Sequence, residues 1–138
     1  AGLPSAIVAK ILNPDKFVLA VVGDGGFMMN SAELETAMRL KLDLAVLVIN
    51  DNGVGMIEWE QKEKNYTTFG LHFNNPDFVL YAESYGAYGA RAKKAEDVFT
   101  LLKEAKERGG VCLIEVPVEY SQNHAVFTEA LNHNTCDL

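Results

Sequence analysis

Hydrophobic residues along this 138-residue chain follow two alternating patterns. The first is an uninterrupted apolar run that ends at glycine, aspartate or asparagine, which predicts a strand buried on both faces of a sheet. Such runs occupy residues 17–22 and 44–49. A largely apolar segment at 111–116 and a shorter one at 89–92 are also predicted to be strands.

The second pattern is an apolar residue at every third or fourth position, typical of a helix buried on one side. An Asn30/Glu33 capping box is expected to open one of these helices, and the Asn75-Pro76 pair another. The predicted helices cover residues 4–12, 30–41, 56–62, 75–84 and 96–108, and residues 63–74 are predicted to form an irregular loop.

Strands that alternate with helices in this order predict an α/β domain with a doubly wound, mainly parallel sheet and helices on both faces. No repeat or Pro/Gly-rich linker divides the chain, so we expect one domain over residues 1–123 and a polar tail over 124–138. Ligands of such sheets bind beyond the carboxyl ends of the strands. Two clusters of turn-forming residues, at 23–26 and 50–53, are expected to lie there.

Composition narrows the classes of partner. With 12 Lys+Arg against 19 Asp+Glu, the chain has a formal net charge of −7, so we expect no nucleic-acid partner. The apolar runs are far shorter than the roughly 20 residues that span a bilayer, so we expect no membrane insertion. Cys112 and Cys136 fit neither a disulfide framework nor a metal-binding pattern, and a cytoplasmic location is expected. The opening Ala1-Gly2-Leu3-Pro4 enters a helical pattern at once, which suggests part of a longer polypeptide.

Candidate chemistry lies where the first two buried strands end. Gly23-Asp24-Gly25-Gly26 follows the first strand, and glycines there allow an anion such as a phosphate to approach backbone N–H groups. Asp24 would repel that phosphate unless a cation lay between them. Asp51 follows the next strand, 27 positions later. If the strands are neighbours, the two carboxylates, a backbone carbonyl of the second turn and phosphate oxygens form a set suited to Mg²⁺.

An ordinary structural turn is the alternative, because Asp-Gly and Asn-Gly pairs are common turn formers. A single Gly-Asp-Gly after a strand favours that alternative. Two acidic turns, one strand-helix-strand repeat apart and each after a buried strand, favour a metal-diphosphate site instead. The residues alone leave both interpretations open.

A longer match adds to this argument. Gly23-Asp24-Gly25 followed by Asn50-Asp51-Asn52 resembles the motif with which thiamin-diphosphate enzymes hold their cofactor through a divalent ion. The surrounding sequence is similar to the carboxyl-terminal domain of acetolactate synthases, particularly the catabolic type, and the similarity extends over residues 1 to about 123. Its clearest stretches are residues 23–52, 55–61, 81–87 and 117–123.

The resemblance implies roles for individual residues. It implies that the carboxylates of Asp24 and Asp51 and the carbonyl of Gly53 bind Mg²⁺. Trp59 or Glu60, on the helix beside the active site, is expected to contact substrate. The cofactor-binding set that it implies is Gly23, Asp24, Gly25, Gly26, Asp51, Gly53 and Met56.

The resemblance also implies an activity: an acetolactate synthase that uses thiamin diphosphate and Mg²⁺ to decarboxylate pyruvate and join the two-carbon unit to a second pyruvate. The activating glutamate of the family lies in another domain, so we expect no catalytic residue here and no turnover by this fragment alone. The expected partners are the amino-terminal and central domains of the same polypeptide, in a homo-oligomer. Two alternatives are another thiamin-diphosphate 2-oxoacid decarboxylase or carboligase, and a noncatalytic assembly module that retains the fold.

Overall fold

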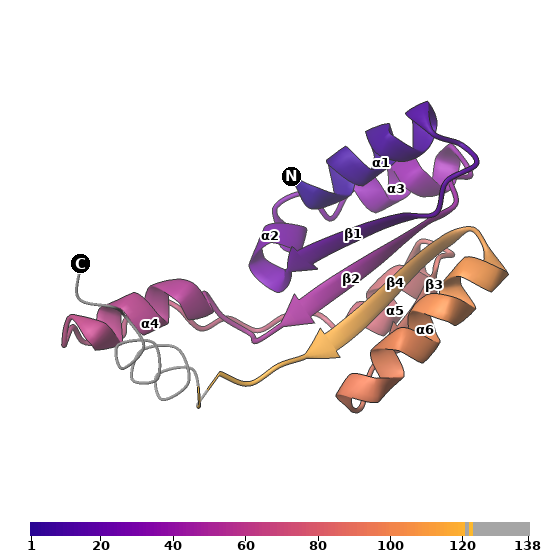
Figure 1. Cartoon of the computed structure of the whole chain (residues 1–138). Coiled ribbons are helices and arrows are strands. Elements are labelled where there is room, and N and C mark those ends of the chain that lie inside the picture. The colour runs from indigo at the N-terminus through magenta and orange to yellow at the C-terminus, as the bar shows by residue number, and fades with distance from the viewer. Residues whose placement is uncertain (121, 123–138) are drawn as a thin grey trace, which may run out of the picture.

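The computed structural model describes residues 1–120 and 122, in which four parallel strands form one sheet with the order β1-β2-β4-β3. The strands are β1 (Val18–Gly23), β2 (Leu44–Asn50), β3 (Tyr88–Arg91) and β4 (Val111–Pro117). The helices are α1 (Gly2–Leu12), α2 (Asp24–Met28), α3 (Glu33–Arg39), α4 (Gly55–Glu63), α5 (Phe78–Ser84) and α6 (Ala95–Arg108) (Figure 1). No helix of this described part is long and apolar enough to cross a membrane. The predicted tail, residues 124–138, lies outside it.

Helices cover both faces of the sheet, which confirms the predicted α/β class (Figure 1). On one face, Val46 and Val48 of β2 pack in a core shared with α1, α2, α3 and α5. On the other face, Ala45 and Leu47 of the same strand pack with Ala105 of α6. Alternate residues of β2 therefore serve two cores, as expected for a strand that is buried on both faces.

The edge strand β1 is covered on one face only. Val18, Ala20 and Val22 join the core beneath α1 and α3. Leu19 and Val21 point to the opposite face and are 38% and 59% exposed, because α6 packs over β2 and β4. One face of β1 thus leaves an apolar surface uncovered within the described residues.

The predicted capping box is wrong. Helix α3 begins at Glu33, and Asn30 contributes its backbone carbonyl, which accepts the Glu33 N–H at 3.1 Å. The reason is conformational: Ala32, the residue before the helix, already has helical backbone angles (φ −59°, ψ −23°), whereas a capping side chain needs an extended residue at that place.

Two other helix starts also differ from the prediction. The cluster at residues 23–26 is not a turn before a later helix, because α2 begins directly at Asp24. Helix α5 begins at Phe78, not at the Asn75-Pro76 pair. Its cap is Asp77, whose carboxylate accepts the N–H groups of Val79 and Leu80 at 2.9 and 3.2 Å, which leaves the Asn75 side chain for another role.

The strand register brings the two turn clusters together. Strands β1 and β2 are parallel neighbours, as the metal-site argument required, and Gly23 pairs with Ile49. Asp24 therefore leaves β1 beside the point where Asn50 and Asp51 leave β2. Both clusters lie at the carboxyl edge of the sheet, where such folds bind ligands.

Candidate functional site

The carboxylate of Asp24 is almost completely buried, with 2% of the residue exposed. Its Oδ1 accepts the N–H of Gly25 at 2.8 Å, and its Oδ2 accepts the N–H of Asn52 at 2.9 Å and the side-chain amide of Asn75 at 2.6 Å. All three donors are neutral. The negative charge is thus stabilised by dipoles, without a cationic side chain among these partners.

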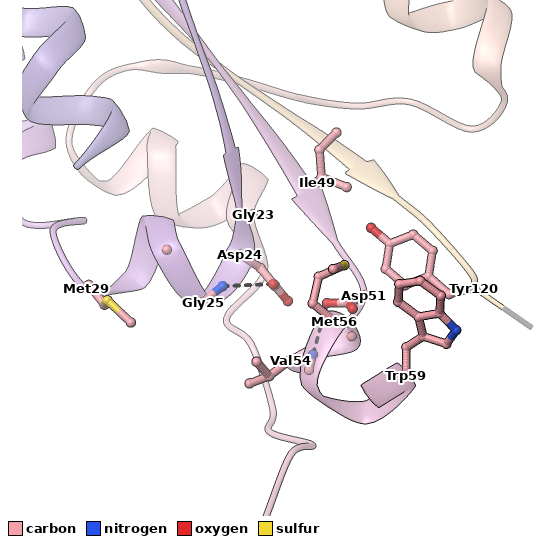
Figure 2. Close-up of a pocket in the computed structure, with 13 residues that line it drawn as sticks. Gly23, Asp24, Gly25, Met29, Ile49, Asp51, Val54, Met56, Trp59 and Tyr120 are labelled. Carbon is pink, nitrogen blue, oxygen red and sulfur yellow. Dashed lines mark hydrogen bonds between the residues drawn. The ribbon is translucent and has the colours of Figure 1, made fainter. Parts of the chain in front are cut away.

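Asp51 is the second carboxylate at this edge, directly after β2. Its Oδ1 accepts the N–H of Gly53 at 3.2 Å, which fixes a tight turn. Burial, and next the charge of Asp24, raise the pKa of Asp51 above its usual range. The two carboxylates point toward each other in the pocket, as Figure 2 shows. A cation between them would remove the repulsion that they otherwise exert on each other.

A neighbouring segment holds this second turn in place. Asn52 has a left-handed backbone (φ 56°), and its carbonyl accepts the N–H of Phe73 at 3.1 Å. The N–H of Val54 is donated to the carbonyl of Leu71 at 3.0 Å. A Cβ at Gly53 would lie 3.0 Å from that same carbonyl oxygen, so the close approach of the two segments favours glycine.

Gly55 is a further requirement of the site, and the sequence prediction missed it. A Cβ at this position would overlap Oδ2 of Asp51 and would lie 2.9 Å from the ring of Tyr120. The first residue of α4 therefore allows the Asp51 carboxylate and an aromatic ring to meet at one point.

The two turns open into a pocket of about 490 Å³ (Figure 2). All seven residues predicted to bind cofactor line it, and so does Trp59. Glu60 is exposed and is not among the lining residues that the structure describes. Sequence reasoning also missed several lining residues; these are Met29, Ile49, Val54, Gly55 and Tyr120. All of these except Val54 lie within the stretches of family resemblance, which was a usable signal.

The donor set and the space fit a magnesium-bound diphosphate. A Cβ at Gly23 or Gly26 would have no atom within 4 Å, so a ligand can approach the backbone there. The described residues hold no group of three or more His, Cys, Asp or Glu side chains that could bind a metal, so further ligands must be other oxygens. Two carboxylates supplemented by carbonyl and phosphate oxygens are typical of Mg²⁺ sites.

The chain is similar to proteins of known family. Residues 1–116 match the family model described as thiamine pyrophosphate enzyme, C-terminal TPP binding domain. The chain is 40% identical over 122 residues to the acetolactate synthase of Bacillus subtilis (strain 168), covering 88% of this chain and 21% of that protein. It is 38% identical over 122 residues to the catabolic acetolactate synthase of Raoultella terrigena, covering 88% and 22%.

A solved structure shares the fold. The thiamine diphosphate-dependent 4-hydroxybenzoylformate decarboxylase of Rhodococcus jostii RHA1 superposes with a TM-score of 0.78 at 33% sequence identity. The match covers 86% of this chain and 23% of that protein. The chain thus spans about a fifth of the length of these relatives.

Proposed function

The chain belongs to the thiamine pyrophosphate enzyme family, as its C-terminal TPP binding domain, and from this we propose that it holds the Mg²⁺-diphosphate end of thiamin diphosphate. In this proposal the carboxylates of Asp24 and Asp51 and the carbonyl of Gly53 bind Mg²⁺. The backbone of residues 23–26 lies against the diphosphate, and Met56 lines the same pocket. The observation that carries the proposal is the pair of carboxylates that face each other, with no cationic side chain among the partners that the structure describes for them.

The contribution of this chain is positioning. When bound, thiamin diphosphate supplies the electron sink that allows a 2-oxoacid to lose carbon dioxide. Asp24 and Asp51 would hold the diphosphate end of the cofactor by way of the metal and so orient the cofactor at the carboxyl edge of the sheet. We assign no catalytic residue to this chain.

For the whole enzyme we propose acetolactate synthase activity, in which pyruvate is decarboxylated and its two-carbon unit is joined to a second pyruvate. The acetolactate synthases at 40% and 38% identity support this reaction. Because the chain spans about a fifth of their length, we infer that amino-terminal and central domains complete the active site and that the chain alone is inactive. A cytoplasmic homo-oligomer is part of the same proposal.

The uncovered side of β1 supports the part of the proposal that concerns partners. Val21 is 59% exposed and Leu19 38% exposed on a face that α6 does not reach. Apolar surface of this kind is typical of an interface. Further polypeptide packed there would bury both side chains.

Substrate contact is proposed for the helix beside the pocket. The indole N–H of Trp59 is buried and has no hydrogen-bond partner among the described residues, and the side chain lines the pocket. A substrate carboxylate or carbonyl oxygen could accept this N–H. Glu60, on the exposed side of α4, would reach substrate only across the interface with another domain.

A 2-oxoacid decarboxylase without carboligation is the second candidate, and the structural likeness to the 4-hydroxybenzoylformate decarboxylase favours it. The products of the whole enzyme with pyruvate as sole substrate separate the two reactions. Acetolactate would support the synthase, whereas acetaldehyde would support the decarboxylase. A noncatalytic assembly module is disfavoured, because packing alone does not require two carboxylates that repel each other.

Substitution of Asp24 tests the metal site in the whole enzyme. We expect Asp24→Ala to abolish Mg²⁺-dependent retention of thiamin diphosphate in equilibrium dialysis, because the buried metal ligand is lost. Asp15→Ala is the matched control, since Asp15 lies in an exposed turn after α1. Undiminished retention by Asp24→Ala would refute the proposed site.

A further inference from the structure

We propose that Asn75 is a positioning residue, which fixes the Asp24 carboxylate in the orientation that binds the cation. The inference rests on the proposed function, because it assumes that Asp24 is a metal ligand. Asn75 lies 51 positions from Asp24, in the loop before α5, and neither the family motif nor the pocket lining includes it. Its role therefore comes from its contacts alone.

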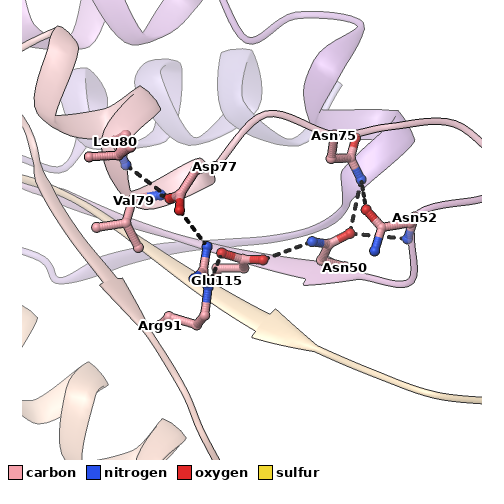
Figure 3. Close-up of polar contacts among 8 residues, drawn as sticks. All are labelled: Asn50, Asn52, Asn75, Asp77, Val79, Leu80, Arg91 and Glu115. Atoms are coloured by element: carbon pink, nitrogen blue, oxygen red, sulfur yellow. Dashed lines mark hydrogen bonds and ion pairs between the residues drawn. The ribbon is translucent and has the colours of Figure 1, made fainter.

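Three oxygen atoms converge on the side-chain nitrogen of Asn75, and Figure 3 shows the two that belong to Asn50 and Asn52. They are Oδ2 of Asp24 at 2.6 Å, Oδ1 of Asn50 at 2.9 Å and Oδ1 of Asn52 at 3.3 Å. A carboxylate oxygen can only accept, so the atom of Asn75 that faces Asp24 must be the amide nitrogen. The amide has two N–H groups for these three acceptors.

A chain of directed hydrogen bonds fixes that orientation from the far side. Nδ2 of Asn50 donates to Oε1 of Glu115 at 2.8 Å, so the Asn50 side-chain oxygen must face Asn75. Glu115 in turn accepts from Nε of Arg91 at 2.7 Å. The buried carboxylate of Glu115 thus sets the direction of Asn50, and Asn50 sets the direction of Asn75.

The same chain closes into a ring through the backbone. Arg91 also contacts the carboxylate of Asp77 at 3.1 Å, and Asp77 is joined to Asn75 by Pro76 alone (Figure 3). Pro76 restricts the backbone between them. The segment 75–77 is therefore held at both ends, and the Asn75 amide has little freedom to leave Asp24.

The hydrogen bond from Asn75 holds the Asp24 carboxylate in place against repulsion by the Asp51 carboxylate. Asp51 repels Asp24, because the two carboxylates face each other in the pocket (Figure 2). Without Asn75, Oδ2 of Asp24 would keep only the N–H of Asn52, and the carboxylate could rotate away from its neighbour. A cation would then have to restore the geometry as it bound, which lowers its affinity.

The test is the binding of Mn²⁺, as a paramagnetic substitute for Mg²⁺, to the 138-residue chain at millimolar concentrations, measured by electron paramagnetic resonance with and without inorganic pyrophosphate. We expect Asn75→Ala to weaken binding about tenfold, as is usual when a partner of a metal ligand is removed. Asn74→Ala, at the exposed neighbouring position, should leave it unchanged.

Two further variants separate the possible outcomes. Phe78→Leu lowers stability through the core of the same segment without touching Asp24, so it should reduce the melting temperature but not Mn²⁺ affinity. Equal losses of affinity in Phe78→Leu and Asn75→Ala would show a merely structural role and overturn the inference.

Asp24→Ala should abolish binding. If it does and Asn75→Ala binds as the wild type does, the inference fails and the proposed function stands. If the wild type binds no Mn²⁺, or if Asp24→Ala binds as well as the wild type, both fail.

Discussion

Two carboxylates are nearly inaccessible in the part of the chain that the structure describes, and their surroundings differ. Asp24 is 2% exposed and Glu115 is 4% exposed. Glu115, in the central strand β4, has the guanidinium of Arg91 at 2.7 Å and the amide of Asn50 at 2.8 Å. Asp24 has three neutral N–H donors and a second carboxylate, Asp51, beside it.

This difference suggests that the Glu115 carboxylate has a structural role, whereas the Asp24 carboxylate has a ligand-binding role. Burial of a carboxylate is costly unless the charge is paired and hydrogen-bonded. Glu115 meets both conditions from within the chain, and it raises the pKa of Arg91 in return. Asp24 is hydrogen-bonded but is not paired with a cationic side chain, and the neighbouring Asp51 adds negative charge. We therefore expect a bound cation to complete the Asp24 site, and three substitutions test this contrast.

Removal of the Glu115 partner should have the largest effect on stability. We expect Arg91→Ala to lower the free energy of unfolding by about 2 to 3 kcal/mol, because it leaves a buried carboxylate without its cation. Urea denaturation in metal-free buffer measures this loss. Arg39→Ala is the control, since it breaks an exposed helical pair with Glu35 and should cost less than about 0.5 kcal/mol. Equal losses in the two variants would contradict the structural role of Glu115.

Of the two buried carboxylates, the sequence predicted a role only for Asp24. Asp24 and Asp51 each follow a buried apolar run, and the run, the turn and the spacing are local signals that also predicted the sheet. Glu115 interrupts an apolar run, which still predicts a strand. Its partner Arg91 lies 24 positions away on the edge strand β3, and no local pattern links the two.

The Asn75-Pro76 pair shows why the sequence did not predict the other residues that support the site. Locally, this pair favours a helix start, and the true cap is Asp77, two positions later. The Asn75 side chain instead donates hydrogen bonds to Asp24 and Asn50. These two residues are distant from it in sequence and are brought close to each other by the strand register. Gly55 was missed for a similar reason, since its need for a bare Cα depends on Tyr120.

Crowding at Gly55 gives the second prediction. We expect Gly55→Ala to lower the free energy of unfolding by about 1 to 2 kcal/mol, because the new methyl group would overlap Asp51 and Tyr120. It should also weaken Mn²⁺ binding by displacing the Asp51 carboxylate. Gly26→Ala is the stability control, since a Cβ there meets no atom within 4 Å. Unchanged stability and metal binding in Gly55→Ala would show that Asp51 is not confined at this point.

The smallest effect concerns the charge of Asp51 itself. Burial and Asp24 raise its pKa in the folded chain above the usual value of 3.8. The unfolded chain therefore ionises first as pH rises, so stability falls from about pH 3.8 upward and the loss is complete above the raised pKa. Asp51→Asn cannot ionise, and its amide oxygen can still accept the N–H of Gly53.

In a chelating buffer at pH 7, Asp51→Asn should therefore be more stable than the wild type, by less than about 1 kcal/mol because solvent screens this partly exposed group. The two proteins should converge near pH 3, where both carry a neutral side chain. Saturating Mg²⁺ should reverse the order, since the wild type offers the metal a second negative charge. Urea denaturation across this pH range, with and without Mg²⁺, measures each step. Parallel pH profiles for the two proteins would mean that Asp51 and Asp24 do not repel each other, and the contrast with Glu115 would lose its basis.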